Sequence, residues 1–145
     1  MEENREAGVW QRVLGSREDG PYGDLQQLQR EAMELAGAYR ALAARTTGSA
    51  QELLRKLHQG EQANAAALTG ILVLSRQHGE HLKLWQPGKE DSRKLLERCY
   101  HRTRRCAVEY MARSADSEFG CVFEQLAKRE QTHCCLIAQV LGLLR

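Results

Sequence analysis

Two glutamates and a histidine stand at positions where a helical protein would ordinarily have apolar side chains. Glu61 and Glu130 each fall on the apolar stripe of a predicted helix, and His133 follows Glu130 by three residues. Residues three apart on a helix project from one face. A buried carboxylate is costly unless it is paired, protonated or bound to a metal. A glutamate and a histidine at this spacing can together bind one iron or manganese ion.

The same side chains also fit a buried hydrogen-bonded network that contains no metal. Its predicted members are Glu130, His133, Asn64, Thr103 and Tyr110. Arg102 would neutralise Glu61 or Glu130 in place of an ion, because a guanidinium group can bind a carboxylate through two hydrogen bonds. Such a network fixes the register of neighbouring helices at some cost in stability. From the residues alone, the metal site and the metal-free network remain two open interpretations.

Helical periodicity places these residues on four predicted helices. Alanine, leucine, glutamate, glutamine and arginine are abundant, and these residue types favour helices. Apolar residues recur at helical spacing over approximately residues 24–45, 49–78, 92–113 and 118–144. Asp24 is a predicted N-cap, as is Asp91 or Ser92. Ser49 and Glu52 form a predicted capping box, in which each side chain satisfies an exposed backbone amide of the other.

Three of the predicted helices carry the polar residues of interest on their inner faces, and of these the fourth helix contributes Glu130 and His133. The predicted inner face of the second helix consists of Leu53, Leu57, Glu61, Asn64, Leu68, Ile71 and Val73 or Leu74. The predicted inner face of the third helix consists of Leu95, Leu96, Cys99, Thr103, Cys106 and Tyr110. On these faces, the polar residues are expected to lie among the apolar residues of the core.

An internal repeat relates the two halves of the chain. Tyr39 precedes Glu61 by 22 residues, and Tyr110 precedes Glu130 by 20 residues, with a short polar break and a helix in each case. The segment at residues 79–88 contains a tryptophan, a proline and a glycine, and it separates the halves. Two helical hairpins joined by a long crossover form a four-helix bundle.

The motifs of both halves resemble those of a rubrerythrin-type, ferritin-like domain. The resemblance rests on Tyr39-Arg40-x-Leu42-Ala43 and Glu61 in the first half, and on Tyr110, the break at residues 114–117 and Glu130-x-x-His133-Cys134 in the second. It implies an all-α, ferritin-like four-helix bundle of two hairpins joined by a crossover. The bundle would occupy residues 24–145, with hairpins at about 24–78 and 90–145, after an N-terminal arm at residues 1–23.

The resemblance implies a ligand set that this chain keeps only in part. The implied iron or manganese ligands are Glu31, Glu61, Glu130 and His133. The second-helix histidine of the family falls on Asn64, and its third-helix glutamate falls near Arg102 or Thr103. His58 lies one turn before Glu61 and is an alternative source of an imidazole. These departures imply one ion rather than an intact di-iron site, or no metal if the site is fully degenerate.

Two functions follow from this resemblance. The first is redox chemistry or iron handling at a partial Glu/His site. The second is a metal-free helical module that kept the fold and acts through interaction with other proteins. Ferritin-like bundles commonly pair, so a homodimer is the implied assembly in either case. Cys-x-x-Cys pairs for electron delivery are absent from the sequence, which disfavours full rubrerythrin activity and leaves enzymatic activity undecided.

The charge and hydropathy of the sequence disfavour two classes of partner, nucleic acid and membranes. The net charge of +2 provides no strong field for nucleic acid or an anionic membrane. The sequence has neither an apolar run long enough to span a bilayer nor a signal-peptide pattern, so a soluble cytoplasmic protein without membrane contact is expected. A basic cluster on the third helix comprises Arg98, Arg102, Arg104 and Arg105. A solvated face explains this cluster better than nucleic-acid binding.

The five cysteines form no recognisable zinc or thioredoxin-type motif. Cys99 and Cys106 are seven residues apart, which places them on one face of the third helix. Free cysteine behaves as a small apolar side chain and is often buried. We therefore expect these two thiols to belong to the core of the bundle.

Overall fold

Four helices make up most of the chain that the computed structural model describes, which is residues 24–75 and 83–144. The helices are α2 (Leu25–Ala44), α3 (Gly48–Leu74), α4 (Ser92–Ala112) and α5 (Gly120–Leu143). The predicted arm at residues 1–23 lies outside the described residues. None of the helices described has the length and the apolar composition that crossing a membrane would require.

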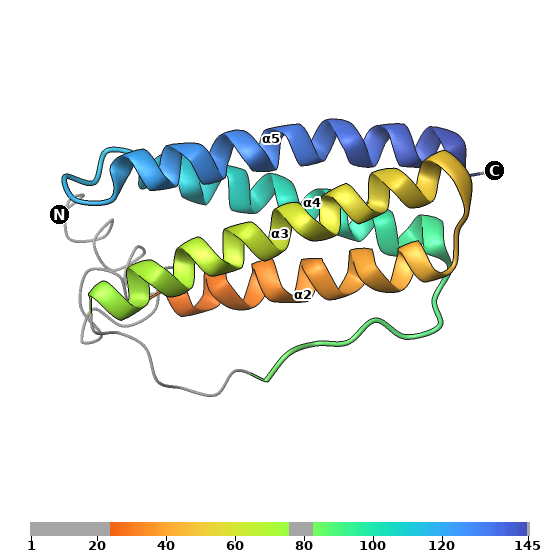
Figure 1. The fold of residues 1–145 in the computed structure, drawn as a ribbon, viewed down its shortest axis with the longest axis horizontal. Helices are drawn as coiled ribbons and strands as arrows, with labels where there is room; N and C mark the ends of the chain where they lie inside the picture. The colour runs from red at the N-terminus through yellow and green to blue at the C-terminus, as the bar shows by residue number, and fades with distance from the viewer. Residues whose placement is uncertain (1–23, 76–82, 145) are drawn as a thin grey trace, which may run out of the picture.

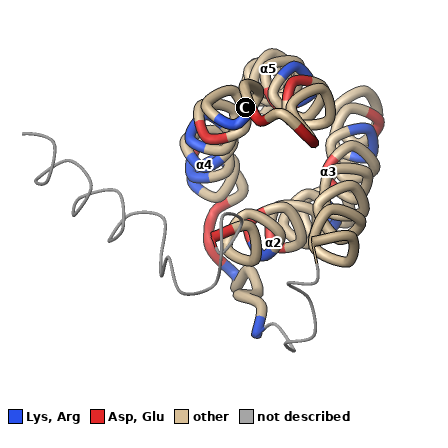
Figure 2. Tube along the Cα trace, turned by 90° about the vertical axis from the view of Figure 1, so that its left-hand side faces the viewer, with Lys and Arg blue, Asp and Glu red and all other residues tan. Residues whose placement is uncertain are grey.

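The helices form two hairpins, one from α2 and α3 and the other from α4 and α5. Viewed end-on, they stand at the corners of a rough square in the order α2, α3, α5, α4 (Figure 2), and each packs against its neighbours in that order. α2 and α5 run in one direction, whereas α3 and α4 run in the other (Figure 1). The connection from α3 to α4 must therefore travel the length of the bundle. The prediction of an all-α bundle of two hairpins is confirmed.

The core consists of the apolar stripes that the four helices turn toward the bundle axis. Tyr39, Tyr110 and Phe123 are its largest fully buried side chains. Every residue predicted for the inner face of the third helix is buried, including Thr103 and the two core thiols. At roughly 25 cal/mol for each Å² of apolar surface removed from water, these stripes hold the helices together far more than helix propensity does.

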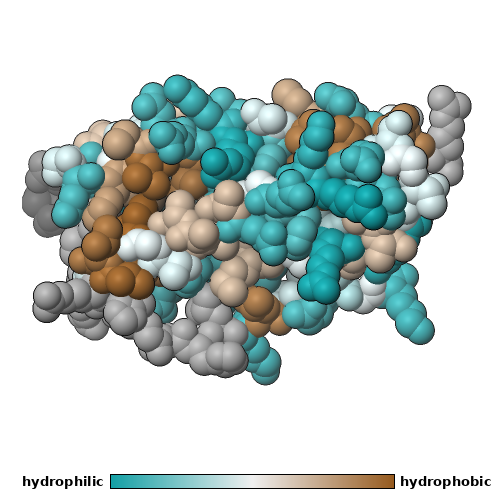
Figure 3. All heavy atoms as spheres, viewed as in Figure 1, coloured by the Kyte–Doolittle hydropathy of each residue, from teal (hydrophilic) through white to brown (hydrophobic). Residues whose placement is uncertain are grey.

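The predicted inner face of the second helix is wrong at its C-terminal end, while at its start the predicted Leu53 packs against the core beside a more deeply buried leucine. Leu54 is fully buried at the start of α3, whereas Leu53 is only half-buried. Near the end of α3, Leu72 is buried while Val73 and Leu74 are 49% and 72% exposed. Apolar residues adjacent in sequence leave the phase of a helix ambiguous by one position. Figure 3 shows apolar side chains gathered at the end of the bundle where α3 terminates.

The predicted N-cap residues lie at the starts of α2 and α4, although only the one at α4 forms a capping bond, and the predicted start of α3 is wrong. Asp91 caps α4, since its carboxylate accepts a hydrogen bond from the backbone amide of Lys94. Asp24 occupies the N-cap position of α2 but forms no side-chain capping bond. Its carboxylate instead pairs with Arg113 at the end of α4. This ion pair joins the beginning of the first hairpin to the second.

The predicted capping box at the start of α3 is wrong. The helix begins at Gly48, one residue before Ser49, and its N-cap residue Thr47 makes no side-chain capping bond. Gly48 has a φ of +69°, a backbone conformation that glycine adopts without steric cost. The chain turns from α2 into α3 through this conformation, so Ser49 already lies inside the helix.

The second helix ends earlier than the predicted boundary at His78. α3 terminates at Leu74, and the Ser75 hydroxyl donates to the backbone carbonyl of Ile71 at 2.8 Å. A serine side chain that bonds to the backbone in this way competes with continued helix formation. Residues 76–82, which include His78, lie outside the described part of the chain.

The end of the crossover is fastened to α2 and α4. The backbone amide of Trp85 donates to Glu34 Oε2 at 2.7 Å, and Arg45 donates to the carbonyls of Gly88 and Glu90. The segment therefore follows α2 toward its C-terminal end, as Figure 1 shows. Two guanidinium groups of α4 lie over the indole ring of Trp85, 5.4 and 5.5 Å from its centroid.

Candidate metal centre

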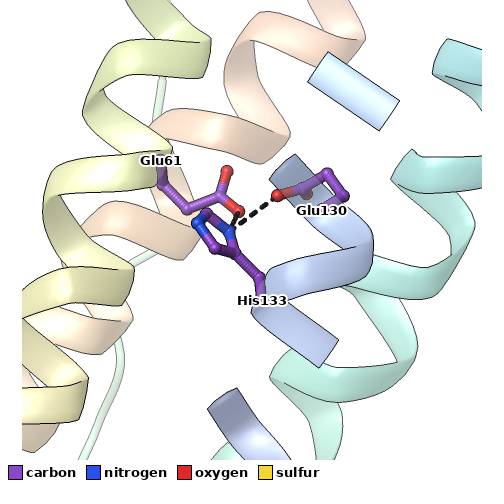
Figure 4. Close-up of side chains that lie close together, drawn as sticks. All are labelled: Glu61, Glu130 and His133. Atoms are coloured by element: carbon purple, nitrogen blue, oxygen red, sulfur yellow. Dashed lines mark hydrogen bonds and ion pairs between the residues drawn. The ribbon is translucent and has the colours of Figure 1, made fainter. Parts of the chain in front are cut away.

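Glu61 on α3 meets Glu130 and His133 of α5 in the interior of the bundle (Figure 4). Nδ1 of His133 lies 2.8 Å from Glu61 Oε2 and 2.8 Å from Glu130 Oε1. One potential ligand atom from each residue lies within 4.8 Å of the other two. The glutamates are 0% exposed and the histidine is 3% exposed. The structure thus brings together three of the four predicted ligands, and this buried triad could bind a metal ion.

Each carboxylate of the triad leaves one oxygen unused. Glu130 Oε1 accepts a hydrogen bond from Asn64 Nδ2 at 3.1 Å in addition to its contact with His133. Glu61 Oε1 and Glu130 Oε2 are buried and have no hydrogen-bond partner within residues 24–75 and 83–144. Burying a polar atom without a partner costs about 1–3 kcal/mol, and more for a charged group. A cation bound between the carboxylates would satisfy both oxygens.

The single imidazole of the triad cannot satisfy both carboxylates. Nδ1 of an imidazole carries at most one proton, so it can donate to only one of the two carboxylates fully. Burial raises the pKa of Glu61 well above its ordinary value, and the negative charge of Glu130 raises it further. Both effects penalise the ionised form of Glu61. A divalent cation would favour that ionised form.

The predicted polar network is present only in part. Asn64 belongs to it, since its Oδ1 accepts a hydrogen bond from Arg129 Nη1 at 2.7 Å while its Nδ2 donates to the triad. Thr103 is bonded instead to Tyr39, with 3.0 Å between the two hydroxyl oxygens. The Tyr110 hydroxyl is buried without a hydrogen-bond partner in the described part of the chain. The network is therefore centred on α3 and α5.

Arg102 does not neutralise Glu61 or Glu130, so that part of the metal-free interpretation is wrong. Its Nε donates to Glu31 Oε1 at 2.9 Å, and its Nη2 donates to Glu34 Oε1 at 2.5 Å. Arg102 thus fastens α4 to α2 with a guanidinium that reaches two carboxylates on successive turns. Glu31, the fourth predicted metal ligand, is held in this ion pair and is not a member of the triad.

His58, the alternative imidazole, points elsewhere in the structure. Its Nδ1 lies 2.8 Å from the backbone carbonyl oxygen of Ala36, and the residue is not a member of the triad. Cys99 and Cys106 are buried, as expected. Burial raises the pKa of Cys99 to about 12, so its thiol stays protonated at neutral pH.

The sequence predictions missed Arg129 and Gly60, which contact Asn64 and His133, and Glu34, which binds Arg102 away from the triad. Arg129 and Glu34 carried no signal, because a charged residue on a helix is usually solvated and its partner depends on the packing of a second helix. Gly60 did carry one. It interrupts a stretch of helix-forming residues immediately before Glu61, and an isolated glycine in a helix usually has a packing reason. In the structure, its α-carbon faces the imidazole of His133.

Comparison with known proteins adds no family to this picture. No protein-family model, curated protein or solved structure matches the chain. The ferritin-like assignment therefore stays a prediction that rests on the motifs of the sequence. The four-helix bundle and the buried triad rest on the arrangement of this chain's own residues.

Proposed function

We propose that this protein is a ferritin-like metal-binding protein that holds one iron or manganese ion at Glu61, Glu130 and His133. The observation that carries the proposal is the pair of buried carboxylate oxygens without hydrogen-bond partners among the described residues, beside a buried imidazole nitrogen. Carboxylate and imidazole ligands suit iron and manganese. Either ion, when bound, would supply one-electron redox chemistry, and bound iron would in addition be a stored ion, which supports a role in redox reactions or iron handling.

The residues around the triad have defined tasks in this proposal. Asn64 holds Glu130 through its amide, and Arg129 in turn holds Asn64. Outer hydrogen bonds of this kind orient the ligands of a metal and tune its affinity. A metal binds the deprotonated form of its ligands, so uptake of the ion should release any proton that the triad carries.

Glu31 stays a prediction as a fourth ligand. It could contribute only after leaving Arg102, which holds it at 2.9 Å. The guanidinium would then keep only its bond to Glu34 and would lose the bond from its Nε. We therefore base the proposed site on the three residues that already converge.

Metal analysis of protein purified without a chelator tests the proposal. After loading with Fe²⁺ or Mn²⁺, the wild type should retain about one ion per chain, as three ligands from a single site imply. Glu61→Gln and Glu130→Gln should lose the ion, since each removes a charge and a ligand oxygen. Glu124→Gln is the matched control, because Glu124 lies exposed on the same helix as Glu130. Wild-type protein that retains no ion, or Gln variants that retain it fully, would refute the site.

A metal-free interaction module is the second candidate function. It is favoured by the contacts that His133 and Asn64 already make with the carboxylates, since these satisfy half of the carboxylate oxygens without an ion. In that case the bundle would act by pairing, and a homodimer is the proposed assembly for either function. Light scattering coupled to size exclusion would show a mass of twice 16.4 kDa. A monomer at micromolar concentration would contradict the dimer.

A further inference from the structure

We infer that Gly60 is a positioning residue for His133, because only a residue without a side chain at this place leaves room for the imidazole. The inference rests on the proposed metal site, since it assigns the position that keeps Nδ1 directed at the two carboxylates. Gly60 has no polar side chain and binds nothing itself. Its role is to leave space on the surface of α3 for the His133 ring.

The geometry shows how tightly the imidazole fits against α3. A Cβ atom on residue 60 would lie 2.6 Å from Cε1 of His133 and closer still to Nε2. Carbon atoms in contact are ordinarily about 3.5–4.0 Å apart. One edge of the imidazole ring therefore contacts the backbone of α3 at Gly60. The opposite edge directs Nδ1 at the two carboxylates.

A side chain at residue 60 could be accommodated only at the expense of the triad. His133 is 3% exposed and lies one turn from Glu130 on the same helix, so the ring has little room to withdraw. If α3 moved outward instead, it would carry Glu61, the next residue, with it. Either adjustment lengthens the 2.8 Å contact between Nδ1 and Glu61 Oε2.

A second glycine of α3 provides a matched control. Glycine weakens a helix interior relative to alanine, so alanine should stabilise the helix wherever its Cβ meets no neighbour. Gly70 lies exposed on the same helix, and a Cβ added to it would meet no atom within 4 Å. Alanine at residue 70 should therefore help the helix without touching the site.

The first experiment measures Mn²⁺ affinity by titration of the full chain. Gly60→Ala should bind Mn²⁺ at least roughly tenfold more weakly than the wild type, as displaced ligands and their supports typically do. Gly70→Ala should bind with unchanged affinity. Equal affinity in Gly60→Ala and the wild type would overturn the inference.

The second experiment needs no metal and separates this inference from the proposed function. Thermal unfolding of the metal-free protein is measured for Gly60→Ala in two backgrounds, the wild type and His133→Ala. With the imidazole present, the substitution should lower the melting temperature. In the His133→Ala background, Gly60→Ala should raise the melting temperature, as Gly70→Ala should, because the clash is gone and alanine stabilises the helix. The same effect in both backgrounds would overturn the inference, whereas a wild type that binds no Mn²⁺ would refute only the proposed function.

Discussion

Arg102 is a single guanidinium group that serves two carboxylates. Its side chain is 18% exposed, and its partners Glu31 and Glu34 are 18% and 8% exposed. Hydrogen bonds between charged groups contribute more than neutral ones, about 1.5–3 kcal/mol each when partly shielded from water. The contact joins α2 to α4 directly. It is therefore a larger contribution to stability than an ordinary surface ion pair.

Replacing this arginine should show that contribution. Arg102→Ala should lower the free energy of unfolding by about 2 kcal/mol, because it leaves two partly buried carboxylates without their cation. Urea denaturation followed by circular dichroism measures the change. Arg104→Ala removes an exposed arginine two residues away and should cost less than about 0.5 kcal/mol. Similar losses in the two variants would contradict this account.

The five thiols divide into a buried pair, an exposed pair and Cys134, which is half-buried. Cys121 and Cys135 are exposed on α5, whereas Cys99 and Cys106 are buried on α4. A thiol reacts as its thiolate, so reactivity requires both access and a suitable pKa. At pH 8, a thiol-specific reagent should modify the exposed pair rapidly and the buried pair only after unfolding. Mass spectrometry of labelled peptides would reveal any early modification of Cys99.

The buried thiol also predicts how stability depends on alkaline pH. The pKa of Cys99 is raised to about 12 in the folded protein by burial, against about 8.5 in an unfolded chain. As the pH rises above that unfolded value, the unfolded chain releases this proton and the folded chain keeps it, so stability falls. The free energy of unfolding of the wild type should therefore fall relative to that of Cys99→Ala as the pH rises from 8.5 towards 10. A constant difference would show that Cys99 ionises normally.

At the residue scale, the sequence predicted the triad and its neighbour Asn64 but missed the other residues around them. Glu61 and Glu130 could be found because a charged residue on an apolar stripe is conspicuous in helical periodicity. The partners of Arg102 could not, because all four helices must be packed before the reach of one long side chain selects a carboxylate. Gly60 showed a signal in the sequence, but its reason is a contact with another helix.

At the scale of single elements, the helix starts differ in how they are stabilised. The Asp91 carboxylate accepts the backbone amide of Lys94 at 3.2 Å, as a capping residue does. Ser49 lies exposed within the first turn of α3 and caps nothing. Four helices were predictable from periodicity alone, whereas the capping role depends on a backbone turn at Gly48 that no spacing rule contains.

These two positions make a direct comparison. Asp91→Ala should cost about 1 kcal/mol, the usual value for losing an N-cap bond. Ser49→Ala should leave stability within about 0.5 kcal/mol of the wild type, since alanine suits a helix interior and no bond is lost. Chemical denaturation of both variants under one set of conditions provides the measurement. A loss in Ser49→Ala as large as in Asp91→Ala would restore the capping box.

For the whole molecule, metal binding and folding should be linked. A ligand that binds only the folded state at a hundred times its dissociation constant adds about 2.7 kcal/mol of stability. For a chain of 145 residues, this should raise the melting temperature by on the order of 8 °C. Glu130→Gln should abolish the Mn²⁺-dependent shift. A similar shift in that variant would locate the ion elsewhere.

The overall arrangement was predictable because the chain repeats its own pattern. Tyr39 and Tyr110 mark equivalent positions of two hairpins, and the long segment at residues 79–88 between them predicted a crossover rather than a short loop. The route of that crossover was not predictable. Its attachment depends on Trp85 meeting Glu34 of α2 and two arginines of α4, and these contacts exist only once both hairpins are packed together.

That attachment gives the bundle an optical probe of its own. The chain has two tryptophans, Trp10 and Trp85. In a Trp10→Phe variant, all indole fluorescence would come from the crossover, beneath the two guanidinium groups of Arg98 and Arg102. Its emission would report release of the crossover, while far-ultraviolet circular dichroism reports the helices. The two signals would separate in time if the crossover detaches before the bundle opens, and would coincide if the whole domain unfolds in one step.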